Sequence, residues 1–261
     1  MIECEFGVQL INASRGNIPE MTEKSEEIII SQTAARAIEA YGGKEIWKKT
    51  RHVEAIASAR GLAFLLKWQP PFDHIKIKTE VGKPYITLQP INRSGDAGIL
   101  DGNLVRLEDS SGNILRERKN PREKFPYGRR LFWWDILDLV YFAGYAFWNY
   151  LTLPALLLRI DIEWTELAPG RLKACFPSFI PTHCPEQYFS FDPITGLLRQ
   201  HDYTAEVMGR WAKAAHIILE HEHWHDIPYP SKRRVTPRRE DGTPAWGPVL
   251  IAIDIHEWSL E

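Results

Sequence analysis

Apolar and polar side chains alternate along much of the chain from residue 52 onward. The run 74–79 alternates strictly, and strand-like runs such as 104–107 are separated by turn residues such as Asp101-Gly102. Alternation with a period of two is typical of strands that pack one face on a core, and Asp-Gly between two such runs is a hairpin signal. No helical segment recurs between the strands, so the pattern predicts an antiparallel meander of about ten or eleven strands.

Several pairings follow from this pattern. The run 63–68 is expected to be a strand that returns across Gly61 on the strand before it. A long strand at 214–224 is expected to pair with 231–237, and the last strand is expected at 249–258.

Two segments follow a helical period instead. Residues 31–41 place apolar side chains on one face behind a capping Ser31, and Gly42-Gly43 ends that helix. A second helix is expected from Leu131 to about Tyr150, and it is apolar all round, as a helix buried in a core is.

The second helix overlaps a stretch without charge, residues 139–158, which has the length of a membrane span. Asp135 and Asp138 lie directly upstream, while Asn149 and Pro154 interrupt the stretch. These residues favour a buried helix, and we expect no stable membrane insertion.

The composition narrows the class of protein. The chain of 261 residues carries 32 Lys and Arg against 34 Asp and Glu, with a mean hydropathy of −0.30. These values exclude disorder and collagen and argue against nucleic acid as a partner. Thirty aromatic residues are more than a minimal core requires, and nine of them fall within 132–150. No shift in composition divides the chain, which predicts an irregular leader over residues 1–30 and a single domain over 31–261.

The cysteines and the N-terminal residues bear on location. Cys4, Cys175 and Cys184 form no CxxC pair, and residues 1–5 carry no basic region of an export signal. A reduced, cytoplasmic setting is the simplest expectation. A secreted protein with a Cys175–Cys184 disulfide is the alternative.

The order of elements and two motifs resemble a known superfamily. The motifs are AIEAYGG at 37–43, followed by Trp47, and FDPITGLLRQHDY at 191–203. Over residues 31–258 the chain resembles the lipoprotein-carrier (LolA/LolB-like) superfamily, and its latter half resembles uncharacterised bacterial proteins with the pattern FDPxTGLLxxHDY.

The resemblance implies a mainly β (α+β) fold: a single curled antiparallel sheet, or half-barrel, with an N-terminal helix. The apolar aromatic helix is expected to cover the concave face. The resemblance also implies an apolar cavity for a lipid-like or flat hydrophobic molecule. Periplasmic lipoprotein carriage is not carried over, because the sequence shows no signal peptide and its internal helix is far more aromatic.

The aromatic helix supplies the candidate ligand-binding residues. At steps of three or four, Asp138, Tyr141, Tyr145 and Trp148 fall on one face. Tyr and Trp combine a large ring with a polar tip, which suits the wall of a ligand pocket, and a buried Asn149 has amide groups to offer a ligand. We therefore predict these five as ligand-binding residues; the alternative is that the rings only fill the core.

Four residues are candidates for catalysis if the protein is an enzyme. His201 and Tyr203 share one face of a predicted strand, and Asp254 and His256 lie one step apart on the face opposite Val249, Ile251 and Ile253. An imidazole beside a carboxylate suits a general base. The alternative is the exposed outer face of a sheet, where such residues are ordinary.

The other polar clusters carry weaker indications. His221 and His223 share a strand face and could bind a metal, but the spacing defines no further ligand, so no metal is predicted. The basic run 232–234 is expected on a solvated hairpin, with an anionic head group at the cavity mouth as the alternative. No cofactor is predicted, because nucleotide, hydrolase and zinc-protease motifs are absent from the sequence.

The sequence thus predicts binding of a hydrophobic or lipid-like small molecule in an aromatic-lined cavity. The alternative is a cofactor-independent enzyme that uses the cavity for acid–base chemistry, such as cyclisation, isomerisation or hydration, on a hydrophobic metabolite.

Overall fold

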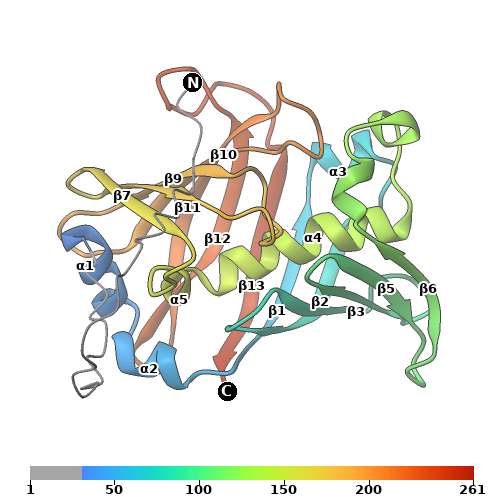
Figure 1. The fold of residues 1–261 in the computed structure, drawn as a ribbon, viewed down its shortest axis with the longest axis horizontal. Coiled ribbons are helices and arrows are strands. Elements are labelled where there is room, and N and C mark those ends of the chain that lie inside the picture. Colours follow the sequence, from blue (N-terminus) through green and yellow to red (C-terminus); the bar gives the residue numbers. More distant parts are fainter. Residues whose placement is uncertain (1–30) are drawn as a thin grey trace, which may run out of the picture.

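The computed structural model describes residues 31–261, and the leader predicted for residues 1–30 lies outside the described residues. Within that range, thirteen strands form one antiparallel sheet in the order β6-β5-β4-β3-β2-β1-β13-β12-β11-β10-β9-β8-β7 (Figure 1). The strands are β1 His52–Arg60, β2 Phe72–Glu80, β3 Tyr85–Gln89, β4 Ala97–Asp101, β5 Leu104–Glu108, β6 Ile114–Lys119, β7 Glu163–Ala168, β8 Arg171–Cys175, β9 Glu186–Phe191, β10 Leu198–Thr204, β11 Lys213–Trp224, β12 Ile227–Pro237 and β13 Ile251–Leu260. The helices are α1 Gln32–Ala40, α2 Lys44–Lys49, α3 Leu62–Leu66, α4 Ile136–Leu151 and α5 Leu153–Leu156, with 3-10 turns at Pro121–Lys124 and Gly128–Leu131.

Two meanders meet at the centre of the sheet. Strands β1–β6 form one and β7–β13 the other, and the first and last strands pair, with Val53 opposite Leu260. Because β6 and β7 are the two edges of the open sheet, the chain between them must cross from one edge to the other. Helices α4 and α5 make that crossing over the concave face (Figure 1). The mainly β half-barrel with an aromatic helix over its concave face is therefore confirmed.

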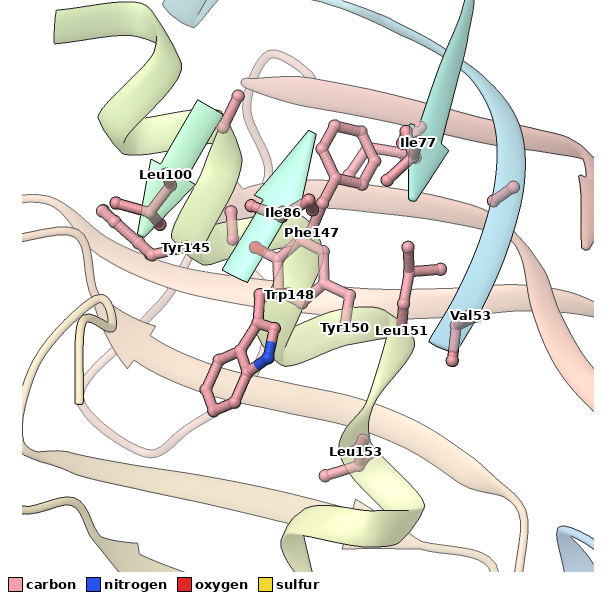
Figure 2. Packing of buried hydrophobic residues seen from close by; sticks show 14 of the residues in the cluster. Val53, Ile77, Ile86, Leu100, Tyr145, Phe147, Trp148, Tyr150, Leu151 and Leu153 are labelled. Carbon is pink, nitrogen blue, oxygen red and sulfur yellow. The ribbon is translucent and has the colours of Figure 1, made fainter. Parts of the chain in front are cut away.

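Helix α4 is held close to the sheet. Asp135 caps it, in a capping box in which the backbone N–H of Asp138 donates to the Asp135 side chain and that of Asp135 to the Asp138 side chain. A Cβ at Gly144 would lie 2.9 Å from Cβ of Leu100, and one at Gly98 would lie 2.5 Å from Val140, so these two glycines permit the close approach. Every residue of α4 from Leu137 to Leu151 is buried, and Figure 2 shows its side chains lying among those of the neighbouring strands.

Helix α4 is 16 residues long. No helix within residues 31–261 combines the length and the apolar character needed to cross a membrane.

Three sequence-based expectations about elements were wrong. The sheet has thirteen strands rather than ten or eleven. The run 63–68, expected to be a strand, contains helix α3, since Leu and Ala favour a helix and only Phe64 of this helix turns into the core. The aromatic helix begins at Ile136 rather than Leu131, because the extended backbone of its N-cap, Asp135, excludes earlier residues.

Candidate functional site

One face of α4 packs against a connecting segment, residues 176–185, rather than against the sheet. The ring of Tyr145 lies 5.0 Å from that of His183, and the ring of Phe142 lies 6.0 Å from it. The side-chain amide of Asn149 donates to the carbonyl of Pro181 over 3.2 Å. The segment therefore forms a second wall opposite the sheet, with α4 between them.

A cleft of about 690 Å³ lies where this segment meets residues 120–123. We call it the Tyr141 cleft, after the α4 side chain that reaches it. Its lining is mainly apolar, with Phe176, Phe179 and Ile180 from the segment, and Arg122 contributes charge. The volume falls within the range of about 300–1,000 Å³ typical of small-molecule sites.

The wall of the cleft is fixed by buried polar contacts. Arg122 donates to the carbonyls of Thr182 and His183, at 3.0 Å each, and forms an ion pair with Glu206. The side-chain amide of Gln187 donates to the hydroxyl of Thr182 and to the carbonyl of Cys184. Backbone groups tied at this many points hold the wall in one shape, as a pre-formed site requires.

The electrostatics of the cleft are set by Arg122. Burial lowers the pKa of this guanidinium, but the neighbouring Tyr145, Tyr141 and Glu206 more than offset that effect, so the pKa is raised. Burial also raises the pKa of Tyr141, and raises that of Tyr145 well above 10, so both phenols are neutral at pH 7. The Tyr145 hydroxyl is buried without a hydrogen-bond partner among the described residues.

Behind the cleft lies a buried cluster of three histidines and two tyrosines, which we call the histidine cluster. Its members are His183, His201, His216, Tyr150 and Tyr203. The Tyr150 hydroxyl lies 2.8 Å from Nε2 of His183 and 3.0 Å from the Tyr203 hydroxyl. The rings of His183 and Tyr203 are stacked, with centroids 3.7 Å apart. Burial lowers the pKa of all three imidazoles well below 6.5, so they are neutral at pH 7.

The five predicted ligand-binding residues take different places. Tyr141 lines the cleft, Tyr145 lies beside His183, and Asn149 holds the wall. Trp148 is fully buried, and its indole N–H donates to the carbonyl of Glu80 over 2.9 Å. Asp138 is fully buried in an ion-pair cluster with three arginines, Arg118, Arg129 and Arg130.

The four predicted catalytic residues lie in two separate places. His201 and Tyr203 belong to the histidine cluster, and Nε2 of His201 donates to Gln187 over 2.7 Å. Asp254 forms ion pairs with Arg234 and Arg60, at 2.8 and 3.4 Å. His256 stacks on His74, with ring centroids 4.2 Å apart, and its Nε2 lies 2.9 Å from the hydroxyl of Ser58.

The histidine-rich strand end also has its own contacts. Nε2 of His221 lies 3.0 Å from the Tyr41 hydroxyl, while His223 is exposed. Across residues 31–261, no group of three or more His, Cys, Asp or Glu side chains is arranged to hold a metal ion. No disulfide joins Cys175 to Cys184.

Sequence reasoning missed His183. It lies in FPSFIPTHCP (residues 176–185), a proline-rich connection without alternation, so no periodic pattern assigns it to a face. The single available signal is a histidine in a strongly apolar segment.

Comparison with protein-family models and with curated proteins finds no match. Among solved structures, 89% of this chain aligns with 94% of a LolA superfamily protein from Nitrosomonas europaea, at 10% identity and a TM-score of 0.49. A domain from Vibrio parahaemolyticus described as an outer membrane lipoprotein-sorting protein aligns over 91% of its length with 88% of this chain, at 10% identity and a TM-score of 0.47. A DUF1329 family protein from Desulfovibrio piger aligns over 92% of its length with 88% of this chain, at 12% identity and a TM-score of 0.42. The superfamily of the first of these structures is the one that the sequence motifs resemble.

Proposed function

We propose that the protein binds a hydrophobic small molecule, lipid-like or flat, in the Tyr141 cleft. The observation that carries this proposal is the cleft itself, because it has the volume of a ligand site and a mainly apolar lining. Apolar surface removed from water by a bound ligand would supply the binding free energy.

The phenol of Tyr141 and the guanidinium of Arg122 would orient a polar end of such a ligand. Both lie at the cleft, and Arg122 is also tied to the wall through two carbonyls. A ligand therefore meets a positive charge whose position is already fixed, which limits the entropy lost on binding.

The geometry favours binding over catalysis. A general acid or base must reach the substrate, directly or through one water molecule. His201 and Tyr203 are almost fully buried, and neither lines the cleft. Acid–base chemistry on a hydrophobic metabolite is therefore the weaker proposal. We keep a cytoplasmic location as part of the proposal, supported by the absence of a Cys175–Cys184 disulfide.

Titration with the neutral fluorescent probe N-phenyl-1-naphthylamine tests the proposal. We expect saturable binding that Phe179→Ala weakens about 5- to 10-fold, because the lost ring removes contact area worth roughly 1–1.5 kcal/mol. Phe179 is 66% exposed, so the fold should tolerate its loss.

The matched control is Trp246→Ala, which removes a larger aromatic side chain that is 97% exposed and absent from the cleft. This variant should bind the probe as the native protein does. No saturable uptake by the native protein, or equal weakening by both variants, would contradict binding in the cleft.

A further inference from the structure

Arg233 is a buried cation without a counter-charge. It lies in β12, is 2% exposed, and forms no ion pair with any carboxylate of residues 31–261. Its neighbours in sequence, Lys232 and Arg234, point to the other face of the sheet and form ion pairs with Glu220 and Asp254. A charge taken out of water without a partner is costly, so its presence needs a reason.

Part of the reason is the end of α4. The carbonyl of Tyr150 would accept from the backbone N–H of residue 154 in a continuous helix, but residue 154 is proline and has no N–H. Nη2 of Arg233 donates to that carbonyl over 3.2 Å, and Nε lies 3.4 Å from the carbonyl of Pro230. A guanidinium has five N–H groups, so these contacts leave three of them unused.

The guanidinium remains charged in this setting. Burial lowers the pKa of Arg233 to about 10, which keeps it protonated at pH 7. The groups nearest to it are the phenol rings of Tyr150 and Tyr41, and the Tyr150 ring lies 5.2 Å from it. Both phenols are neutral, since burial raises the pKa of Tyr41 to about 12 and that of Tyr150 further.

Arg233 also lines a narrow slot. The slot holds about 20 Å³, room for one or two water molecules, and Arg233 is the only charged residue that lines it. Tyr41, Trp47, Leu151 and Trp258 are among its apolar and aromatic walls. The buried Ser231 hydroxyl, two residues before Arg233 in β12, has no hydrogen-bond partner among the described residues.

We propose that this slot is a second binding site, which takes the carboxylate of a small acid with an apolar body. The unused N–H groups of Arg233 would receive the two carboxylate oxygens, and the aromatic walls would cover the carbon chain. A guanidinium matches a planar carboxylate in a two-bond arrangement, and the width of the slot excludes a bulkier head group. The site is separate from the Tyr141 cleft, because the two share no lining residue.

Calorimetry with octanoate, octanol and octyl phosphate tests the assignment. The native protein should bind octanoate at least 10-fold more tightly than octanol or octyl phosphate. Arg233→Gln keeps an N–H donor for the Tyr150 carbonyl but removes the charge, and it should weaken octanoate binding 10- to 100-fold while leaving octanol binding unchanged. The matched control is Arg234→Gln, which removes a charge on the other face and should leave octanoate binding intact.

Equal affinity for octanoate and octanol in the native protein would overturn the proposal, as would undiminished octanoate binding by Arg233→Gln. If Arg233→Gln does not fold, the comparison of octanoate with octanol on the native protein decides alone. Phe179→Ala separates the two sites, because octanoate should still bind when the Tyr141 cleft is impaired. Loss of octanoate binding in Phe179→Ala would place the acid in the cleft and refute the slot.

Discussion

The protein is expected to lose about 4 kcal/mol of its free energy of unfolding when the pH falls from 7.5 to 5.5. Burial lowers the pKa of His183, His201 and His216 well below 6.5, the value expected in the unfolded chain. Below pH 6.5 the unfolded chain therefore takes up three protons that the native state does not. Each proton contributes about 1.4 kcal/mol per pH unit, and the stability is fully present above pH 6.5. The loss is a large part of the roughly 5–15 kcal/mol typical of a folded domain.

Urea unfolding at pH 7.5, 6.5 and 5.5 measures this effect. His216→Phe should reduce the pH-dependent loss by about a third, since it removes one of three equivalent terms. Neither ring nitrogen of His216 has a hydrogen-bond partner among the described residues, so the variant should not be less stable at pH 7.5. His223→Gln, at an exposed position, is the control and should follow the native curve. A stability that does not change between pH 7.5 and 5.5 would show that the native histidine cluster accepts protons.

Replacing Asp138 with asparagine should cost about 3–5 kcal/mol, because removing one member of a buried ion-pair cluster leaves charges without compensation. The Asp138 carboxylate is fully buried and lies 2.6 to 2.7 Å from nitrogen atoms of Arg118, Arg129 and Arg130. Asp135 would be left as the one carboxylate facing three guanidinium groups. Asparagine keeps the shape and one oxygen for the capping box, so the loss reports mainly on charge.

Equilibrium unfolding of D138N at pH 7.5 checks this value. The control is Glu240→Gln, which removes the carboxylate of an exposed pair with Lys213 and should have no measurable effect. A D138N variant as stable as E240Q would show that the arginines are solvated without Asp138.

The sheet was predictable where strands have one buried face. In β2, the residues that pack inward alternate with charged residues, and this pattern is visible in the sequence. The edge strand β6 was not predicted, because its residues are exposed on both faces and show no apolar period. Helix α3 was mistaken for a strand because a short apolar run has no period of its own and the turn after Gly61 decides its conformation.

The candidate sites were predictable only in part. The helical period placed Tyr141, Tyr145 and Asn149 on one face, and that face does meet the wall of the cleft. The slot was hidden in a basic run, because strand alternation turns Lys232 outward and buries Arg233. The histidine cluster joins α4, β10, β11 and a loop, and no local pattern reports which distant elements meet.

The central ladder between β1 and β13 has a consequence for how the chain is made. Val53 pairs with Leu260, so the innermost strand of the first meander stays without one neighbour until the last residues have been synthesised. A ribosome adds about 5–20 residues per second, so that strand waits on the order of ten seconds or more with an open edge. Loss of even the last ten residues would leave this edge open permanently. We therefore expect C-terminally truncated or stalled chains to be the form that aggregates and that chaperones hold.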